Sequence, residues 1–263
     1  MDLGIKGKIA LVAAASSGLG RAVAEELAAE GTSLVLCARD GNKLRQTAES
    51  IKQSSNTDVL PITADVTSKA DLERLVSSAI QRFGRIDILV TNAGGPPAGN
   101  FDQISSDQWE HAARLTLFSA IELARLVLPG MKTRRWGRIL NITSIAVKQP
   151  VDNLILSNSL RAAVTGFART LANEVAGDGI TVNNILPGYT RTERVEELAQ
   201  MIAQKQGIDA ASVKAKWELE IPMRRLGEPL EFAALAAFLV SERAAYITGT
   251  SIQVDGGWIR SLF

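Results

Sequence analysis

The chain has 263 residues but only one cysteine and one histidine, and this scarcity argues against two kinds of site. A single cysteine, Cys37, cannot form an internal disulfide. It lies in the apolar run 34–38, so we expect it to be a small buried hydrophobe. A zinc site draws its three or four ligands mainly from cysteine and histidine. With one of each, Cys37 and His111, no metal is expected.

The chain also lacks an excess of charge of either sign and any long apolar run. It has 29 basic and 28 acidic residues, for a formal net charge of +1. Nucleic acids and anionic membrane surfaces attract proteins that present a basic field, so neither partner is expected. Residues 1–8 contain no apolar signal core, and no stretch approaches the ~20 apolar residues of a membrane-spanning helix. We therefore expect a cytoplasmic protein.

What the chain does have is a regular alternation of short apolar runs with longer helical patterns. Strands that are apolar on both faces, each followed by a helix, are typical of a parallel sheet covered on both sides. Right-handed crossovers predict a Rossmann-like, doubly wound α/β fold with seven strands. No linker or repeat interrupts residues 1–263, so one domain is expected. Strands are predicted at 9–13, 33–37, 58–63, 86–90, 138–142, 180–185 and 251–254, and helices at 21–30, 40–53, 68–83, 105–131, 152–176 and 230–240.

The helices predicted at 105–131 and 152–176 are long, and residues 191–220 are polar. The helix over 105–131 is expected to end near Pro129 and Gly130, because proline and glycine disfavour helix continuation. Residues 191–220 are predicted to form two short helices.

Three short motifs follow the predicted strands, at the edge of the sheet where ligands bind in such folds. Residues 13–20 read AAASSGLG and precede a helix, a setting in which glycines let the backbone approach a phosphate at the helix N-terminus. Residues 91–95 read TNAGG, and residues 187–192 read PGYTRT.

With these motifs, residues 5–258 resemble the short-chain dehydrogenase/reductase family almost end to end. Segments 222–229, 246–249 and 254–257 are similar to those of bacterial 3-oxoacyl-ACP reductases. The resemblance implies reduction of a small or acyl-type carbonyl substrate with a nicotinamide cofactor. It also implies a homotetramer or homodimer formed through the helices at 105–131 and 152–176, and a mobile substrate lid at 191–220.

The resemblance also assigns residues to the cofactor. Ala14 replaces the family's first glycine, and a methyl group there costs about 1 kcal/mol if φ must be positive. Arg39, at the tip of the second strand, implies NADP, although Asp40 leaves NAD possible; alternatively, the two form a surface salt bridge. Asp65 would contact the adenine, or else cap the next helix, a role that Ser68 can also fill. The implied cofactor residues are Ala14, Ser17, Gly18, Leu19, Gly20, Arg39, Asp65, Val66, Asn92, Ala93, Gly94, Arg161, Pro187, Gly188 and Thr192.

The catalytic positions depart from the family's pattern. The family uses an Asn, a Ser, a Tyr and, four residues after the Tyr, a Lys. The matching positions here are Thr116, Ser144, Ser157 and Arg161, so only the first Ser is retained. Residues 162–167 fix the register of this helix, and the chain's two tyrosines, Tyr189 and Tyr246, match other family positions.

The substitution changes the proton chemistry that the family relies on. A tyrosine has a pKa near 10, which a neighbouring cation lowers further, whereas a serine hydroxyl is a poor proton donor near pH 7. Arg161 can hold ribose hydroxyls, but its usual pKa is too high for it to shuttle a proton.

Three other residues are candidate stand-ins for the missing donor. Lys148 is otherwise a solvated loop lysine, and His111 is otherwise a surface residue of a helix. Tyr189 lies beside the nicotinamide-side motif and would have to reach inward.

Two hypotheses about function follow. The first is an NADP(H)-binding, 3-oxoacyl-ACP reductase-like oxidoreductase with an altered or weakened proton-donor site. The second is a catalytically inactive member that binds a nucleotide and acts as a scaffold or regulator.

Overall fold

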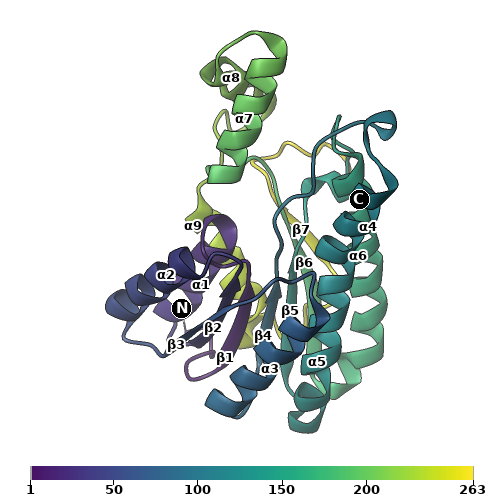
Figure 1. Cartoon of the computed structure of the whole chain (residues 1–263). Coiled ribbons are helices and arrows are strands. Elements are labelled where there is room, and N and C mark those ends of the chain that lie inside the picture. The colour runs from purple at the N-terminus through teal and green to yellow at the C-terminus, as the bar shows by residue number, and fades with distance from the viewer. Residues whose placement is uncertain (1, 263) are drawn as a thin grey trace.

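The computed structural model describes residues 2–262, which form an α/β fold around one parallel sheet of seven strands (Figure 1). The strand order is β3-β2-β1-β4-β5-β6-β7, and every neighbouring pair is parallel. This confirms the predicted Rossmann-like fold class. The strands are β1 (Ile9–Ala13), β2 (Ser33–Ala38), β3 (Val59–Thr63), β4 (Ile88–Thr91), β5 (Gly137–Ile142), β6 (Ile180–Pro187) and β7 (Ser251–Val254).

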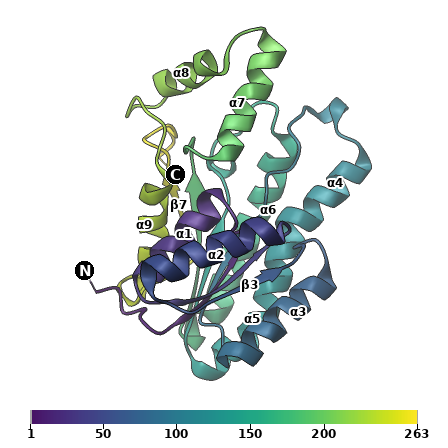
Figure 2. The same ribbon diagram turned by 60° about the vertical axis from the view of Figure 1, so that its left-hand side comes forward.

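Helices cover both faces of this sheet, as Figures 1 and 2 show. Helices α1, α2 and α9 pack on one face and α3, α5 and α6 on the other, and each layer has its own apolar core. Cys37 is buried as expected, and burial raises the pKa of its thiol to about 11. The helices are α1 (Gly18–Ala29), α2 (Gly41–Ser55), α3 (Lys69–Phe83), α4 (Ser106–Ala113), α5 (Ser119–Arg134), α6 (Ile155–Val175), α7 (Glu193–Gln206), α8 (Ala210–Glu220) and α9 (Pro229–Leu239).

The order of the strands determines where a ligand can bind. From β1, the chain first adds β2 and β3 on one side and then crosses to add β4 on the other. The crossovers on the two sides of the β1–β4 boundary therefore run in opposite directions and leave a crevice at the carboxyl ends of these strands. The motifs that follow β1, β4 and β6 all meet at this edge.

The prediction of one long helix over 105–131 is wrong in two respects. It consists of α4 and α5 joined by a π-helical turn at Arg114–Phe118, and α5 continues past Pro129 to Arg134. Proline removes one donor without ending the helix, because the last turns are held elsewhere: Arg134 Nη2 donates to Ile86 O at 2.6 Å, and Met131 is fully buried.

The second long helix starts three residues later than predicted, at Ile155. Asn153 has a φ of +60°, a left-handed conformation that asparagine tolerates and that a helix start cannot contain. The backbone here pairs with Gly99, whose N donates to Asn153 O at 2.6 Å. The segment before α6 therefore closes against the loop that follows β4.

Helices α7 and α8, predicted as two short helices in 191–220, project from the carboxyl edge of the sheet (Figures 1 and 2). They bury a small core of their own, which includes Ala199, Val213 and Trp217. Within residues 2–262 no helix is both long and apolar enough to span a membrane.

Candidate functional site

A cavity of about 510 Å³ opens at the carboxyl edge of the sheet, where the crevice was expected. It runs from the tip of β2 across the turn after β1 to the start of α6, and α7 forms part of its wall. Most of the site residues expected from the sequence line it together: Ala14, Ser17, Gly18, Leu19, Arg39, Asp65, Val66, Asn92, Ala93, Gly94, Ser144, Ser157, Arg161, Pro187, Gly188 and Thr192. Gly20 and Thr116 are the two that do not.

The turn after β1 has the shape that its glycines indicate. Gly18 has a φ of +56°, and Ala14 has a φ of +49°, so Ala14 adopts the left-handed conformation for which the family uses glycine. Gly20 lies beneath the turn, where a Cβ atom would come within 2.4 Å of Ala14 O and 2.8 Å of Asn92 Nδ2. Its role is close packing of α1 against the turn.

The N-terminus of α1 faces the cavity without a competing charge. Ser17 is its N-cap residue but makes no side-chain cap hydrogen bond in the part of the chain that the structure describes, and the first turn contains no acidic residue. The partial positive charge of the helix end and the Ser17 hydroxyl are therefore available to an anion such as a diphosphate.

The tip of β2 presents a free cation to the same cavity. Arg39 is exposed and makes no ion pair within residues 2–262, so the alternative of a surface salt bridge with Asp40 is wrong. Asp40 instead caps α2, accepting hydrogen bonds from Asn42 N at 2.9 Å and Lys43 N at 3.0 Å. A carboxylate used in this way competes less for ribose hydroxyls.

The residues after β3 and β4 form the middle of the cavity wall. Ser68 caps α3, with its Oγ accepting from Asp71 N at 3.3 Å. Asp65 accepts from Thr67 N at 2.9 Å and Thr67 Oγ1 at 2.8 Å, which fixes the loop that faces the cavity. Asn92 Nδ2 donates to Ala14 O at 3.4 Å, so it joins the end of β4 to the glycine-rich turn.

At the other end of the cavity, Ser144, Ser157 and Arg161 come together. Ser144 Oγ accepts from Ala146 N at 3.1 Å. Arg161 Nε donates to Ser157 Oγ at 3.1 Å, and its Nη1 donates to Ile142 O at 3.1 Å and Thr143 O at 2.7 Å. Burial, and in second place the charge of Arg194, lowers the pKa of Arg161 to about 10. The guanidinium is therefore more acidic than the sequence alone suggested.

Thr116 lies in the π-helical turn and faces a second, much smaller space. A cavity of about 10 Å³ is lined by Thr116, Thr143 and Arg161 among others. The hydroxyls of Thr116 and Thr143 are buried and have no hydrogen-bond partner among residues 2–262. A space of this size is at the lower limit for one water molecule. Arg161 lines both spaces, as do Asn92, Ala93, Ile142 and Thr143, so the small cavity adjoins the large one.

The three stand-ins for a proton donor are all placed away from this role. Lys148 is held by Gln253, with Nζ 2.8 Å from Oε1, and His111 is exposed on α4; neither lines the large cavity. Tyr189 does line it, but its ring stacks on Trp217 at 4.4 Å. Burial, together with Glu220, raises the pKa of Tyr189 to about 12.

Sequence reasoning missed Arg194, which extends from α7 across the cavity. Its Nη2 donates to Pro96 O at 3.3 Å, and its guanidinium lies against Gly95. The only available signal was its position two residues after Thr192, in a segment where charges are numerous. Thr143 was also missed, because a threonine beside a retained serine has no distinguishing pattern.

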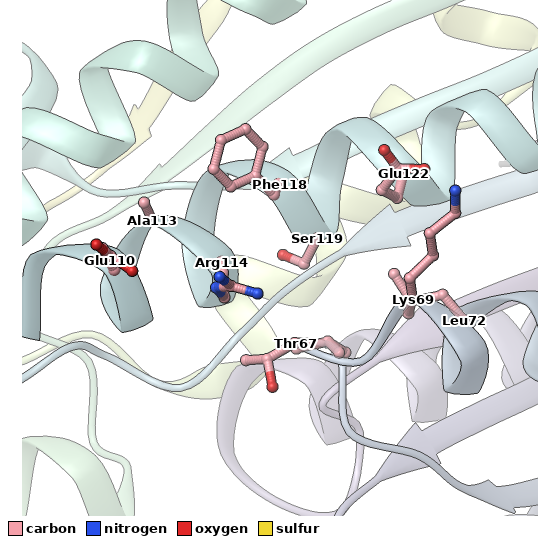
Figure 3. Close-up of a pocket in the computed structure, with 10 residues that line it drawn as sticks. Thr67, Lys69, Leu72, Glu110, Ala113, Arg114, Phe118, Ser119 and Glu122 are labelled. Atoms are coloured by element: carbon pink, nitrogen blue, oxygen red, sulfur yellow. The ribbon is translucent and has the colours of Figure 1, made fainter. Parts of the chain in front are cut away.

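A further surface cavity, of about 480 Å³, lies between α3 and the α4–α5 junction (Figure 3). Lys69, Glu110, Arg114 and Glu122 surround it together with the exposed ring of Phe118. Apart from Val66, it shares no residue with the cavity that contains Ser144 and Ser157.

A family model described as Enoyl-(Acyl carrier protein) reductase matches residues 13–259. The chain is 34% identical over 255 residues to the 3-oxoacyl-[acyl-carrier-protein] reductase FabG of Escherichia coli strain K12, covering 97% of this chain and 98% of that protein. The chain belongs to the short-chain dehydrogenase/reductase family.

Solved structures of this short-chain dehydrogenase/reductase family superpose closely on the chain. L-sorbose reductase from Gluconobacter frateurii, complexed with NADPH and L-sorbose, has a TM-score of 0.95 and 36% identity, with all of both chains covered. An actinorhodin polyketide ketoreductase with NADPH has a TM-score of 0.93 and 30% identity, covering 97% of this chain and 98% of that one. These short-chain dehydrogenases/reductases act on different carbonyl compounds, so membership of the family does not define a substrate.

Proposed function

We propose that this protein is an NADP(H)-dependent carbonyl reductase, similar to the 3-oxoacyl-ACP reductases, in which Ser157 stands at the proton-donor position. One observation carries the proposal: a single continuous cavity joins a free cation at Arg39 to the two serines, Ser144 and Ser157. That arrangement suits a long anionic dinucleotide with a carbonyl substrate at its far end.

The residues of the cavity fit such a cofactor. Arg39 offers an unpaired guanidinium to a 2′-phosphate, and the N-terminus of α1 with Ser17 offers donors to a diphosphate. Gly94 leaves room on the floor of the cavity, since no atom lies within 4 Å of where its Cβ would be. When bound, the reduced cofactor would supply a hydride to the substrate carbonyl carbon.

The chain's own residues would orient the substrate and stabilise charge on its oxygen. Ser144 and Ser157 both line the cavity, and the hydroxyl of either could donate a hydrogen bond to a carbonyl oxygen there. Ser157 itself accepts from Arg161, which polarises its hydroxyl. Its proton is still held more tightly than that of a tyrosine, so turnover slower than in family members with Tyr and Lys is expected.

The choice of NADP over NAD follows from the charges at β2. Arg39 is unpaired, whereas Asp40 is occupied as a helix cap. A charged hydrogen bond to a phosphate is worth about 1.5–3 kcal/mol, so NADPH should bind at least about tenfold more tightly than NADH.

Two measurements test the proposal. The protein is titrated with NADPH and with NADH while cofactor fluorescence is followed, and turnover is then assayed with 3-oxoacyl thioesters and simple ketones. Tight NADPH binding with measurable reduction supports it. Binding without turnover of any carbonyl substrate would favour the rival function, a nucleotide-binding scaffold or regulator, which the loss of the Tyr and Lys supports. Absence of binding would contradict both.

Three further expectations belong to this proposal. The chain acts as one domain in the cytoplasm, with α7 and α8 as the lid over the substrate. It assembles as a homotetramer or homodimer through α5 and α6. In the dinucleotide complex Thr192, whose Oγ1 accepts from Val195 N at 3.3 Å, would face the nicotinamide side of the cavity.

A further inference from the structure

Helix α7 begins with two opposite charges, Glu193 and Arg194, and both side chains line the large cavity. The carboxylate of Glu193 is already paired, because Lys43 of α2 donates to its two oxygens at 2.9 and 2.6 Å. Lys43 does not line the cavity, so this ion pair adds no free charge to the space. Arg194 is therefore the charge that α7 offers to a ligand.

The chain uses only part of the hydrogen-bonding capacity of Arg194. Its Nη2 donates to Pro96 O at 3.3 Å. Its Nη1 lies 3.6 Å from Oε2 of Glu197, which is beyond ordinary hydrogen-bond length, and Glu197 is exposed and does not line the cavity. A guanidinium has five N–H donors, so most of them have no acceptor within residues 2–262.

A glycine makes room for this guanidinium. The Nε and Nη2 atoms of Arg194 lie 3.2 and 3.3 Å from the place where a Cβ atom of Gly95 would be. Gly95 is not among the residues with positive φ, so its backbone conformation does not require glycine. Any side chain at residue 95 would push the guanidinium aside. Gly95 and the Pro96 carbonyl thus position the cation at the cavity.

The same part of the cavity has no carboxylate left to neutralise a cation. Among its lining residues between 92 and 198, the charged ones are Arg161, Glu193 and Arg194, and Lys43 holds Glu193. The charge of Arg194 contributes to lowering the pKa of Arg161, so the two guanidinium groups repel each other. An anion between them would relieve this repulsion. The apolar lining residues here include Ile145, Val151, Leu154, Val195 and Leu198.

We propose that Arg194 binds a carboxylate of the substrate, and that the substrate class is an oxo acid with a short apolar chain between ketone and carboxylate. This inference rests on the proposed function and names its substrate class. Ser144 and Ser157 would hold the ketone oxygen, and the apolar side chains would contact the carbons in between. A carboxylate can accept two parallel N–H bonds from one guanidinium, which orients the substrate as well as binding it.

The phosphates of the cofactor are the other anions that an arginine in this cavity could bind. They have donors of their own at the N-terminus of α1 and at Arg39. The residue of this segment that lies over the glycine-rich turn is Thr192, whose Cγ2 is 3.7 Å from the place of a Cβ atom on Gly18. Arg194 lies instead against the loop after β4. The observations therefore favour the substrate as its ligand.

The first test measures kcat/KM for 3-oxobutanoate, 4-oxopentanoate and 5-oxohexanoate, each against its uncharged methyl ester. A charged hydrogen bond favours the acid, and the 45% exposure of the Arg194 side chain limits the gain. We expect wild type to prefer the acid by about tenfold at the best chain length. Arg194→Gln should reduce the ratio to about one, mainly through KM, and Arg194→Lys should retain part of the preference.

Arg191→Gln is the matched control in the same segment. Arg191 pairs with Glu218 at 3.4 Å and Glu228 at 2.9 Å and does not line the large cavity. This variant should keep the wild-type ratio of acid to ester. The dissociation constant of NADPH, measured by fluorescence, should stay within about twofold of wild type in all of these variants.

The second test measures binding without turnover. With NADP⁺ in place of NADPH no hydride is available, so calorimetry reports the dissociation constants of acid and ester alone. Wild type should bind the acid about tenfold more tightly, and Arg194→Gln should lose this difference. Acid-selective binding without reduction by NADPH would support the carboxylate site while contradicting the proposed function.

Two results would overturn the inference and leave the proposed function intact. One is a wild type that reduces acid and ester equally well. The other is an Arg194→Gln variant that binds NADPH about tenfold more weakly while its ratio of acid to ester is unchanged, because Arg194 would then serve the cofactor.

Discussion

The backbone at Ala14 carries a strain that glycine would remove. Its φ of +49° lies in the left-handed region. That conformation costs about 1–2 kcal/mol for a residue with a Cβ atom. Part of the gain from Ala14→Gly is lost to the greater entropy of the unfolded chain. We expect the variant to raise the free energy of unfolding by about 0.5–1 kcal/mol, measured by urea denaturation.

The neighbouring Ala13 provides the control for that measurement. It is fully buried in β1 and is not among the residues with positive φ, so Ala13→Gly should destabilise the protein by about 0.5–1 kcal/mol. If both variants shift stability in the same direction, the strain assigned to residue 14 is absent.

The chemistry at residue 157 can be tested by restoring the family's pair. Ser157→Tyr combined with Arg161→Lys would return a phenol with a cation four residues away, and positioned acids contribute about 10²–10⁴-fold. Because the Ser157–Arg161 pair already supplies a weaker route, we expect kcat to rise by about 10–10²-fold at saturating NADPH. A Ser157→Phe/Arg161→Lys variant, of the same bulk but without the hydroxyl, should show no gain. A double variant with Tyr that is no faster than this control would argue that position 157 does not face the substrate.

At the scale of elements, local pattern was enough to locate the strands and most of the helices. The apolar run that became β1 has the predicted bounds, because a strand buried on both faces leaves an uninterrupted apolar signal. The edge strand β7 also has the predicted bounds, although its four residues are only half-buried. The π-helical turn at Arg114–Phe118 had no such signal. It depends on how α4 and α5 pack against α6, a tertiary constraint that a single sequence does not display.

The parts of the site that depend on backbone conformation could be predicted from the sequence. Glycine positions and loop lengths after β1, β4 and β6 reflect close approach of the chain, so they appear in the sequence. The small cavity lined by Arg161 depends instead on four separate segments, which contribute Asn92, Thr116, Thr143 and Arg161 among others. Thr143 has no distinguishing pattern in its own segment, and only the fold brings these residues around one space.

The contact between α1 and the turn before it sets a strict limit on residue 20. A Cβ atom there would come within 2.4 Å of Ala14 O, and that atom belongs to the main chain and cannot move aside. We expect Gly20→Ala to destabilise the protein by about 1–3 kcal/mol and to weaken NADPH binding at least about tenfold by shifting the helix N-terminus. Thermal unfolding and fluorescence titration measure the two effects.

Gly166 in α6 provides the control for Gly20→Ala, because the same substitution there should raise the stability of the protein. No atom lies within 4 Å of the place where its Cβ atom would be, and alanine favours a helix interior over glycine by about 1 kcal/mol. Gly166→Ala should therefore stabilise the protein. Equal losses in the two variants would mean that the close packing at Gly20 is not what limits that position.

At the scale of the whole molecule, the face formed by the α4–α5 junction is the place to test assembly. Phe118 is 52% exposed there, and in Figure 3 its ring lies on the side of the helix away from Thr67 and Leu72. One exposed aromatic residue does not by itself mark an interface, but Phe118 adjoins α5, through which the proposed oligomer would form. We expect the chain to form a homotetramer or homodimer in which this ring is buried.

Phe118→Asp should break that assembly. Burial of one such side chain contributes about 1.5–3 kcal/mol, and a twofold interface contains it twice, so the loss is about 3–6 kcal/mol and the dissociation constant rises about 10²–10⁴-fold. Light scattering at micromolar concentration should show a smaller mass for this variant. Phe101→Asp changes a residue that is 69% exposed but lies in the turn Phe101–Gln103 before α4 and does not line the cavity at the α4–α5 junction, so it should leave the mass unaltered. A monomeric wild type, or a Phe118→Asp variant of full mass, would contradict an interface on this face, and the ring would then have to be explained by the cavity it borders.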